Sequence, residues 1–347
     1  MKRFALFSVF VASLFCFVNG SSADKVGMIE GKGRPLDGAI LLITAEKVTI
    51  LDNKEKQQEI PANTVAWTSY EGEPPELATA RTAVNGGRMQ EAIDALAKIE
   101  PKQLTGDGMK GDGMKQDYAY FLAYAKAKLV LAGGGNAEDA EKELSNFLKN
   151  FKTSYHYYEI CEIYGDMMVQ LGRFDDAKKS YDALKKAPWP EYNLKATVSL
   201  GMAEISEGKA DAAKRNFEAV IASTDESPQA ERQKSMAKIG LALCLVADKK
   251  YEEAVETLER IARESGSEDA LFQAMVYNSL GSAYDQADKP HEAALAYMHT
   301  DILFSSARSE HIKSLKELHR LWKKIQRTTR AEEVAKRLKD LYNETVK

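Results

Sequence analysis

The spacing of apolar and polar positions changes once along the chain. Between residues 24 and 70, short apolar or β-branched segments alternate with turns rich in Gly, Pro, Asn and Asp, which predicts four or five short strands. So few residues predict a small curled sheet or barrel-like module that leans on the helices after it. Residues 71–75 contain two adjacent prolines, which cannot continue a strand but can begin a helix, and mark the boundary. From Glu76 onward the period is helical, so the sequence predicts a mainly α fold.

A spaced motif of small and large residues recurs within the helical part. A small residue is followed 12 positions later by a second and four further on by a large one, as in Gly165–Ala177–Tyr181, Gly201–Ala213–Phe217, Ala242–Ala254–Leu258 and Gly281–Ala293–Tyr297. Antiparallel helices approach closely where both carry small residues, and the large residue fills the groove beside the crossing. The motif predicts about seven helix pairs, near residues 76–100, 116–150, 154–187, 192–222, 230–264, 268–305 and 309–345.

These motifs resemble the tetratricopeptide repeat. The resemblance is carried by residues 277–284 with 291–297, and by Tyr164-Gly165 with Phe174 to Ala177 and Tyr181. It implies an α-solenoid of antiparallel helix pairs over residues 76–347. The whole layout is similar to exported bacterial tetratricopeptide repeat proteins that carry a small SH3- or Sm-like β module before the repeats.

The first 23 residues have the layout of a secretory signal peptide. Lys2-Arg3 precedes an apolar run from Phe4 to Val18, and small residues follow up to Ala23. The run is shorter than the roughly 20 residues that span a bilayer. We therefore expect cleavage near Ala23 and a location outside the cytoplasm, either periplasmic or secreted.

Charge is distributed unevenly along the chain. The full sequence has a net charge of −4, and removing Lys2 and Arg3 with the leader leaves −6. Residues 308–347 hold 12 Lys+Arg and 6 Asp+Glu, so they carry +6 and the remainder −12. The chain as a whole is not basic, which argues against nucleic acid as a partner. The basic terminal helix pair is either a solvated cap or a contact for an acidic surface.

Catalytic and metal-binding patterns are missing from the sequence. His311 and His319 are eight apart and do not face one side of a helix, and Cys161 and Cys244 lack metal-ligand spacing. Both cysteines are predicted to be buried thiols rather than a disulfide, because helix pairs a repeat apart lie too far from one another. The tandem Gly106 to Lys115 is predicted to be a loop. We expect no cofactor, no metal and no enzymatic activity.

The tetratricopeptide resemblance implies that the first helix of each pair lines a concave face. Matching the motif residue by residue places there Glu159, Glu162 and Asp166 from the third pair, Lys195, Val198 and Met202 from the fourth, and Asn278, Ser282 and Asp285 from the sixth. The resulting surface has an acidic edge beside an apolar middle. Such a groove suits a peptide or helix that carries some positive charge.

The hypothesis from the sequence is a non-enzymatic, exported scaffold or adaptor. It would bind a protein or peptide partner in the cell envelope through its concave groove, with no stable membrane span once the leader is cleaved. Two alternatives stay open: a chaperone-like assembly factor for envelope proteins, and a structural homo-oligomer joined through the basic C-terminal helices.

Overall fold

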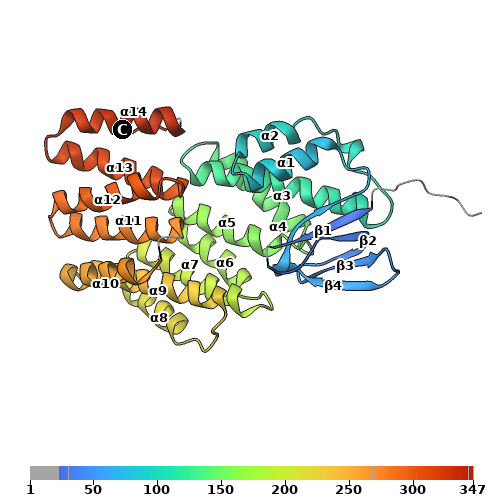
Figure 1. Cartoon of the computed structure of the whole chain (residues 1–347), viewed down its shortest axis with the longest axis horizontal. Coiled ribbons are helices and arrows are strands. Elements are labelled where there is room, and N and C mark those ends of the chain that lie inside the picture. The colour runs from blue at the N-terminus through green and yellow to red at the C-terminus, as the bar shows by residue number, and fades with distance from the viewer. Residues whose placement is uncertain (1–22, 30, 267–268, 343, 347) are drawn as a thin grey trace, which may run out of the picture.

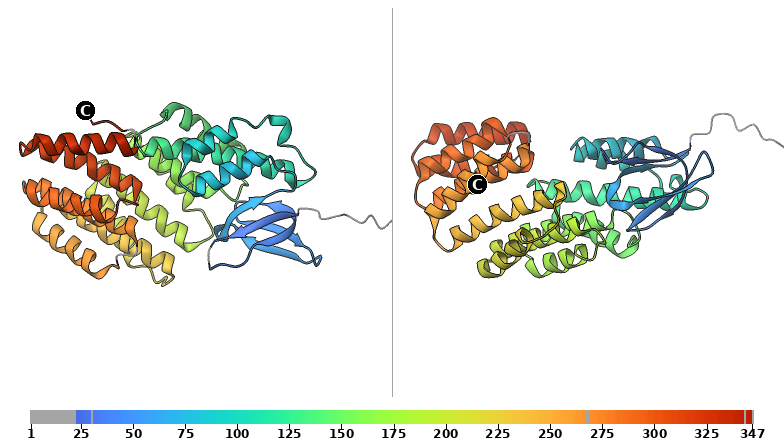
Figure 2. Two further views of the ribbon diagram at one scale, coloured as in Figure 1. Left: turned by 45° about the horizontal axis from the view of Figure 1, so that its top comes forward. Right: turned by 60° about the horizontal axis from the view of Figure 1, so that its bottom comes forward.

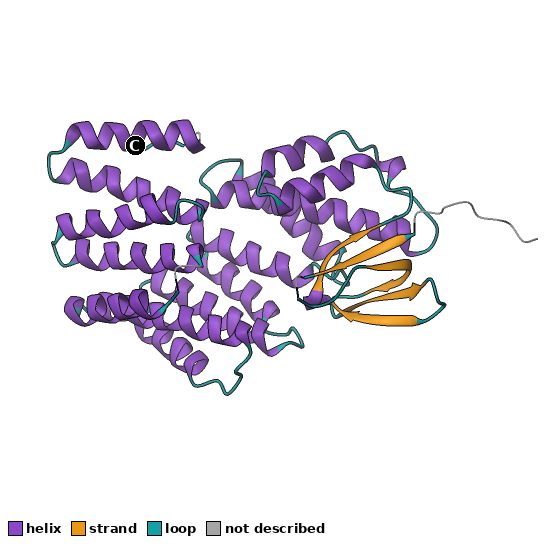
Figure 3. Cartoon of the chain, viewed as in Figure 1, coloured by secondary structure: helices purple, strands orange, loops and turns teal. Residues whose placement is uncertain are grey.

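The computed structural model describes residues 23–29, 31–266, 269–342 and 344–346. The predicted signal peptide lies outside these residues, apart from its last position. The first element is a five-stranded antiparallel sheet, called the β module below, with strand order β4-β3-β2-β1-β5 (Figures 1 and 3). Its strands are β1 (Asp24–Met28), β2 (Leu36–Ile43), β3 (Lys47–Asp52), β4 (Gln57–Pro61) and β5 (Val65–Ser69).

The sheet is open, so of the two forms expected from the sequence, a curled sheet or a barrel-like module, the structure has the curled sheet and not the closed barrel. The edge strands β4 and β5 are joined by the single 3₁₀ turn Ala62–Thr64 and do not pair with each other. Irregularities in register at Gly27/Met28 and between Ile40 and Leu42 curve the sheet. One apolar face, which includes Val26, Val48 and Ile50, joins the core of the first helices. The helices complete this core, so closure of the sheet on itself is not needed.

Seven antiparallel helix pairs follow the β module, as predicted, and helices make up most of the described chain (Figure 3). The pairs are α1 (Pro75–Asn85) with α2 (Met89–Leu96), α3 (Met109–Leu131) with α4 (Ala137–Asn150), α5 (Tyr157–Gln170) with α6 (Phe174–Leu184), α7 (Pro190–Ser206) with α8 (Ala210–Ile221), α9 (Pro228–Ala247) with α10 (Tyr251–Glu264), α11 (Ala270–Gln286) with α12 (Pro290–Leu303), and α13 (Arg308–Lys324) with α14 (Thr328–Tyr342).

The predicted small and large residues meet at the helix crossings. A side chain on Gly281 would meet the Tyr297 ring at 2.6 Å, and one on Gly201 would meet the Phe217 ring at 2.6 Å. Phe217 also covers Gly240 of α9, so one ring joins the fourth and fifth pairs. The glycines are there because an aromatic ring of a neighbouring helix lies directly against their backbone.

Helix α3 begins earlier than predicted. It starts at Met109, after Gly108 with a φ of 57°, so the second half of the glycine tandem is helical and not a loop. Gly113 packs against the Tyr70 ring at the end of the β module. A glycine inside a helix weakens a sequence-based helix assignment, but here it permits close contact between α3 and the sheet.

The helix pairs follow a curved path that brings distant parts of the chain together (Figure 2). Ala132, at the end of α3, packs against the apolar core of the last two pairs. Beside it, the carboxylate of Glu344 approaches Gly133 and pairs with Lys316 at 3.0 Å. Among the described helices, none is both long and apolar enough to cross a membrane.

Candidate functional site

A cleft of about 430 Å³ lies where the β module meets the first helices of four successive pairs. One wall comes from the β module and the end of α1, including Ile29, Asn63, Val65 and Asn85. The other comes from α3, α5 and α7 and contains Tyr120, Tyr124, His156, Glu159, Glu162, Tyr192 and Lys195. This space is called the module cleft below. It is a composite site, since neither the β module nor the helices would form it alone.

Three carboxylates of α5 are among the residues predicted to line the concave face. Glu159, Glu162 and Asp166 are spaced by three and four residues, which places them on one face of the helix. Glu159 accepts a hydrogen bond of 2.9 Å from the Tyr120 hydroxyl. Burial alone would raise the pKa of Glu159, but the donors His156 and Tyr120 outweigh it and lower that pKa. Glu159 is therefore ionised at neutral pH.

Glu162 and Lys195 connect α5 to α7 across the module cleft. Their side chains form an ion pair of 2.6 Å and are 23% and 40% exposed. Burial opposes the charge on Lys195, yet the nearby carboxylates, Glu162 foremost, raise its pKa overall. The charged partner of Lys195 thus comes from the neighbouring repeat, so two of the predicted residues are paired with each other.

Asp166 lies one turn further along α5 and belongs to a second hollow. Its carboxylate accepts a hydrogen bond of 2.8 Å from Tyr181. Burial, and then the negative charge of Glu162, raise the pKa of Asp166 to about 6. The second hollow, about 910 Å³, runs between the α1–α2 turn, the end of α3 and the α12–α13 connection, and we call it the central groove. Its lining includes the apolar side chains Met89, Leu129, Leu131 and Leu271.

His156 forms the floor of the module cleft. Its ring stacks on Tyr120 with 3.4 Å between centroids and 4° between planes, and the residue is 5% exposed. The ring nitrogens lie 3.5 Å from Asp117 and 3.8 Å from Glu159. Burial opposes protonation, but these two carboxylates dominate and raise the pKa of His156. The imidazole links the cleft to the buried contact between the β module and the helices.

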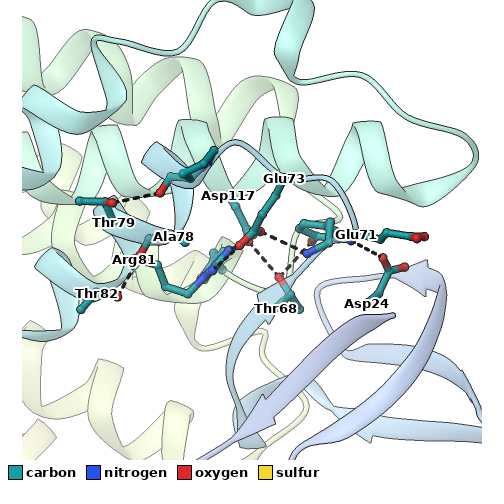
Figure 4. A network of polar contacts seen from close by, with 12 residues as sticks. Asp24, Thr68, Glu71, Glu73, Ala78, Thr79, Arg81, Thr82 and Asp117 are labelled. Carbon is teal, nitrogen blue, oxygen red and sulfur yellow. Dashed lines mark hydrogen bonds and ion pairs between the residues drawn. The ribbon is translucent and has the colours of Figure 1, made fainter. Parts of the chain in front are cut away.

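That buried contact is a network of polar groups behind the cleft (Figure 4). Arg81 of α1 donates two hydrogen bonds of 2.8 Å to Glu73 and lies 3.8 Å from Asp117 of α3. Asp117 is fully buried and accepts a 2.9 Å hydrogen bond from Thr68 of β5. Because the single Thr68 proton goes to Asp117, the hydroxyls of Tyr70 and Tyr155 donate to the Thr68 oxygen at 3.0 and 3.1 Å.

Three further contacts fix the start of the β module. Asp24 accepts backbone hydrogen bonds from Ile40 and Glu71, and Lys110 of α3 pairs with Glu71 at 2.6 Å. Figure 4 shows Asp24 and Glu71 beside the central network. The position of the β module, and with it one wall of the module cleft, is thus set by directional polar contacts.

The remaining predicted groove residues have other surroundings. Val198 is 4% exposed and belongs to the core with Phe217, so it packs between helices instead of facing the groove; Met202 packs partly against the same core. Asn278 is 1% exposed and donates to Glu310 at 2.9 and 2.7 Å, which fastens α11 to the start of α13. Ser282 lies partly exposed one turn further along α11.

Asp285 and the basic C-terminal pair neutralise one another in part. Asp285 pairs with Arg320 and Lys324, and Lys324 also lies 3.2 Å from Asp288. On the same terminal pair, Arg337 donates two hydrogen bonds to Asp301 of α12. Part of the positive charge counted from the sequence is therefore used within the chain, which weakens the terminus as a contact for an acidic partner.

Several residues of the module cleft were not among those predicted. Tyr120 and Tyr124 lie one turn apart on α3, and Tyr192 begins α7 near Glu159 and Glu162. The spacing of the α3 tyrosines was a usable signal, because positions four apart share a helix face. Asn63 carried no signal, since only the packing of the β module brings it into the cleft.

The described residues hold no group of three or more His, Cys, Asp or Glu side chains arranged to bind a metal ion. Cys161 and Cys244 are both free and buried, as predicted. Burial raises the pKa of Cys161 to about 12 and that of Cys244 to about 11, so neither thiol is a reactive thiolate at neutral pH.

Comparison with known proteins agrees with the helix pairing. Residues 184–313 match the family model of a tetratricopeptide repeat-like domain. The helical part of the chain therefore has a tetratricopeptide-type fold, with an N-terminal sheet of five strands. No curated protein sequence matches the chain.

Two solved structures share the overall fold. A tetratricopeptide repeat protein from Parabacteroides merdae is similar with a TM-score of 0.51 and 14% identity, over 77% of this chain and 92% of the other. A Rap protein complexed with competence and sporulation factor has a TM-score of 0.51 and 13% identity, over 77% of this chain and 75% of the other. At these identities the likeness describes the fold and not the activity.

Proposed function

We propose that this protein is a non-enzymatic scaffold that binds a polypeptide partner through its concave face. The module cleft carries the proposal, because Glu159, Glu162 and Lys195 converge there from two repeats beside a wall supplied by the β module. The Rap protein with a similar fold was solved in complex with a factor, which supports binding as a role for such helix arrays. The β module adds a fixed second surface to the partner site.

We further propose that the protein works outside the cytoplasm, in the cell envelope. The support is the sequence of residues 1–23, with its basic start, apolar run and small residues near Ala23. The test is N-terminal sequencing of protein recovered from the periplasmic fraction. A mature N-terminus close to Asp24 is expected, whereas an intact Met1 in the cytoplasmic fraction would contradict this location.

The partner site is tested by affinity capture from an envelope extract. Wild type is compared with two variants. The concave triple carries Glu159→Lys, Glu162→Lys and Asp166→Lys, and the convex triple carries Asp182→Lys, Glu218→Lys and Glu253→Lys. The convex positions are exposed on the second helices of three pairs and introduce the same charge change. A stoichiometric partner should be retained by the convex triple and lost by the concave triple. Equal retention by both triples would overturn the assignment.

A chaperone-like role is the second candidate. It is favoured by the size and apolar lining of the central groove, which would accommodate an extended apolar segment. Capture distinguishes the two functions: many unfolded clients in substoichiometric amounts indicate the chaperone, and one stoichiometric partner indicates the scaffold.

A further inference from the structure

The module cleft is lined by groups that accept hydrogen bonds and by aromatic rings. We propose that it binds the cationic side chain of an arginine or lysine of the partner, between the Glu159 and Glu162 carboxylates and the cleft tyrosines. This inference rests on the function proposed above and names the chemistry that the cleft recognises. Three features of the site support it: unfilled carboxylate acceptors, aromatic walls and an unpartnered amide oxygen in one wall.

The two carboxylates have acceptor capacity to spare. Lys195 approaches one oxygen of Glu162, and Tyr120 donates to one oxygen of Glu159. A carboxylate has about four lone-pair sites, so most of this capacity is unused. Lys195 is the one lysine or arginine among the described residues lining the cleft. Arginine and lysine side chains donate hydrogen bonds and accept none, which complements this lining.

The aromatic rings provide faces for the same cation. Tyr120, Tyr124 and Tyr192 line the cleft from α3 and α7. Burial, followed by the charges of Glu159 and Glu162, raises the pKa of both Tyr124 and Tyr192. The negative potential of the carboxylates therefore extends over these rings. A guanidinium or ammonium group against a tyrosine face gains cation–π attraction in the same field.

An acceptor without a partner lies in the wall of the cleft. The His156 ring is almost fully buried and lines the cleft, but its Nε2 faces Asp117 Oδ1 at 3.5 Å and belongs to the buried network. The Asn63 amide donates to Glu191 at 2.7 Å, but its oxygen has no partner. Such unsatisfied groups cost stability and are rare in native structures. An unpartnered amide oxygen such as that of Asn63 is expected at a site whose ligand donates hydrogen bonds.

Other ligand classes fit less well. The two carboxylates would repel an anionic side chain, since Lys195 pairs with Glu162 and the His156 ring is shared between Glu159 and Asp117. A purely apolar side chain would leave the charges desolvated and unpaired. The described residues also lack the three-ligand cluster that a metal ion needs. The cationic side chain of an arginine or lysine is the remaining class of ligand that fits the module cleft.

The test uses defined probes and ligand-observed NMR on the full chain. The probes are acetylated Ser-Arg-Ser amide, the same peptide with citrulline in place of arginine, and spermidine as a free small cation. Citrulline keeps the shape of arginine and removes its charge. The arginine peptide should bind about tenfold more tightly than the citrulline peptide, as expected for loss of a charge-assisted pair. Tighter binding of spermidine than of the arginine peptide would overturn the assignment to a polypeptide side chain.

Variants locate that preference in the cleft. Glu162→Gln and Glu159→Gln should each weaken binding of the arginine peptide about tenfold, while Lys195→Met should strengthen it because Glu162 is released. Glu218→Gln, an exposed carboxylate on α8, is the matched control and should change nothing. Thermal unfolding shows whether each variant is folded, and Lys195→Met keeps the test valid because misfolding cannot strengthen binding.

The outcomes separate the two proposals. Equal binding of the arginine and citrulline peptides, or equal effects of Glu162→Gln and Glu218→Gln, would overturn the cation site. If the partner is still lost from the concave triple in that case, the scaffold function stands without it. If arginine is preferred but no partner depends on the concave face, the cleft chemistry stands and the scaffold function fails.

Discussion

Phe217 and Asp117 are both fully buried between structural units, yet they hold those units together by opposite chemistry. Phe217 fills the space between Gly201 and Gly240, so it joins neighbouring helix pairs through shape alone. Asp117 joins the β module to α1, α3 and α5 through Thr68, Arg81 and His156. The repeats are thus joined by apolar packing, and the β module is oriented by a polar network.

The difference between apolar packing and a polar network indicates what each contact does for the structure. Small and large residues that fit together recur in successive pairs, so this contact can extend an array indefinitely. A buried polar network is directional and fails when one member is lost, so it fixes a single orientation. Orientation matters at the β module because Asn63 and Val65 form one wall of the module cleft.

Removing the ring between two repeats should have the largest effect. Phe217→Ala leaves a cavity between α7, α8 and α9 and should destabilise the protein by about 3–5 kcal/mol in urea unfolding. The matched control is Ile302→Ala, at a side chain that is 65% exposed, with an expected change within about 0.5 kcal/mol. Similar losses at the two positions would show that the apolar contact between repeats is not the main source of stability.

Breaking the polar network should cost slightly less and should act locally. Arg81→Met removes the cation of Glu73 and leaves the buried Asp117 with His156 alone, and should cost about 3 kcal/mol. Hydrogen exchange should rise first in strands β1–β5, with the C-terminal pairs still protected. Uniform loss of protection over all seven pairs would contradict a separate role for this network.

Adding one methyl group at a crossing should have a smaller effect. Gly281→Ala places its Cβ about where the Tyr297 ring lies, at 2.6 Å, and should cost about 2 kcal/mol through overpacking. The double variant Gly281→Ala with Tyr297→Leu should recover part of this loss, because the smaller side chain vacates the contact. If Gly281→Ala stabilises the protein, the higher helix propensity of alanine outweighs the clash with Tyr297, and the proposed role of this glycine is wrong.

The smallest expected effect is the dependence of stability on pH at His156. Asp117 and Glu159 raise the pKa of His156 despite its burial, and Tyr120 and Tyr155 enclose the ring. The stabilisation by the charged His156 ring is therefore fully present below about pH 6.5, which is the pKa of histidine in the unfolded chain. It is lost as the pH rises through the pKa of His156 in the folded protein. The melting temperature of wild type should fall over that range more than that of His156→Gln. Parallel pH profiles for the two proteins would exclude this charge interaction.

The fold was largely predictable because packing between repeats leaves a periodic signal. Gly165, Gly201 and Gly281 recur with a fixed distance to Tyr181, Phe217 and Tyr297, and each ring lies on its glycine. The helical part of the glycine tandem was not predictable, since Gly113 is explained only by Tyr70 from the β module. The strand segments alone also do not predict whether the sheet is open or closed, because this depends on the helices that cover it.

The candidate site was predictable only where it lies on a repeat. Glu159, Glu162 and Lys195 followed from their helix positions and lie in one cleft. Val198 and Asn278 occupy matching motif positions but are buried, because motif spacing gives a helix face and not its contacts. Asn63 and His156 enter the cleft through contacts between segments far apart in the chain, which no local pattern records.

The proposed binding site for the polypeptide partner is the concave face beside the β module. It is tested most directly by placing a photo-reactive phenylalanine analogue at Tyr192, in the cleft, or at Glu218, on the opposite helix layer, and mapping cross-links to the captured partner by mass spectrometry. If the partner binds there, cross-links form from position 192 to a segment of the partner that contains arginine or lysine, and none form from position 218. Cross-links from position 218 alone would contradict it.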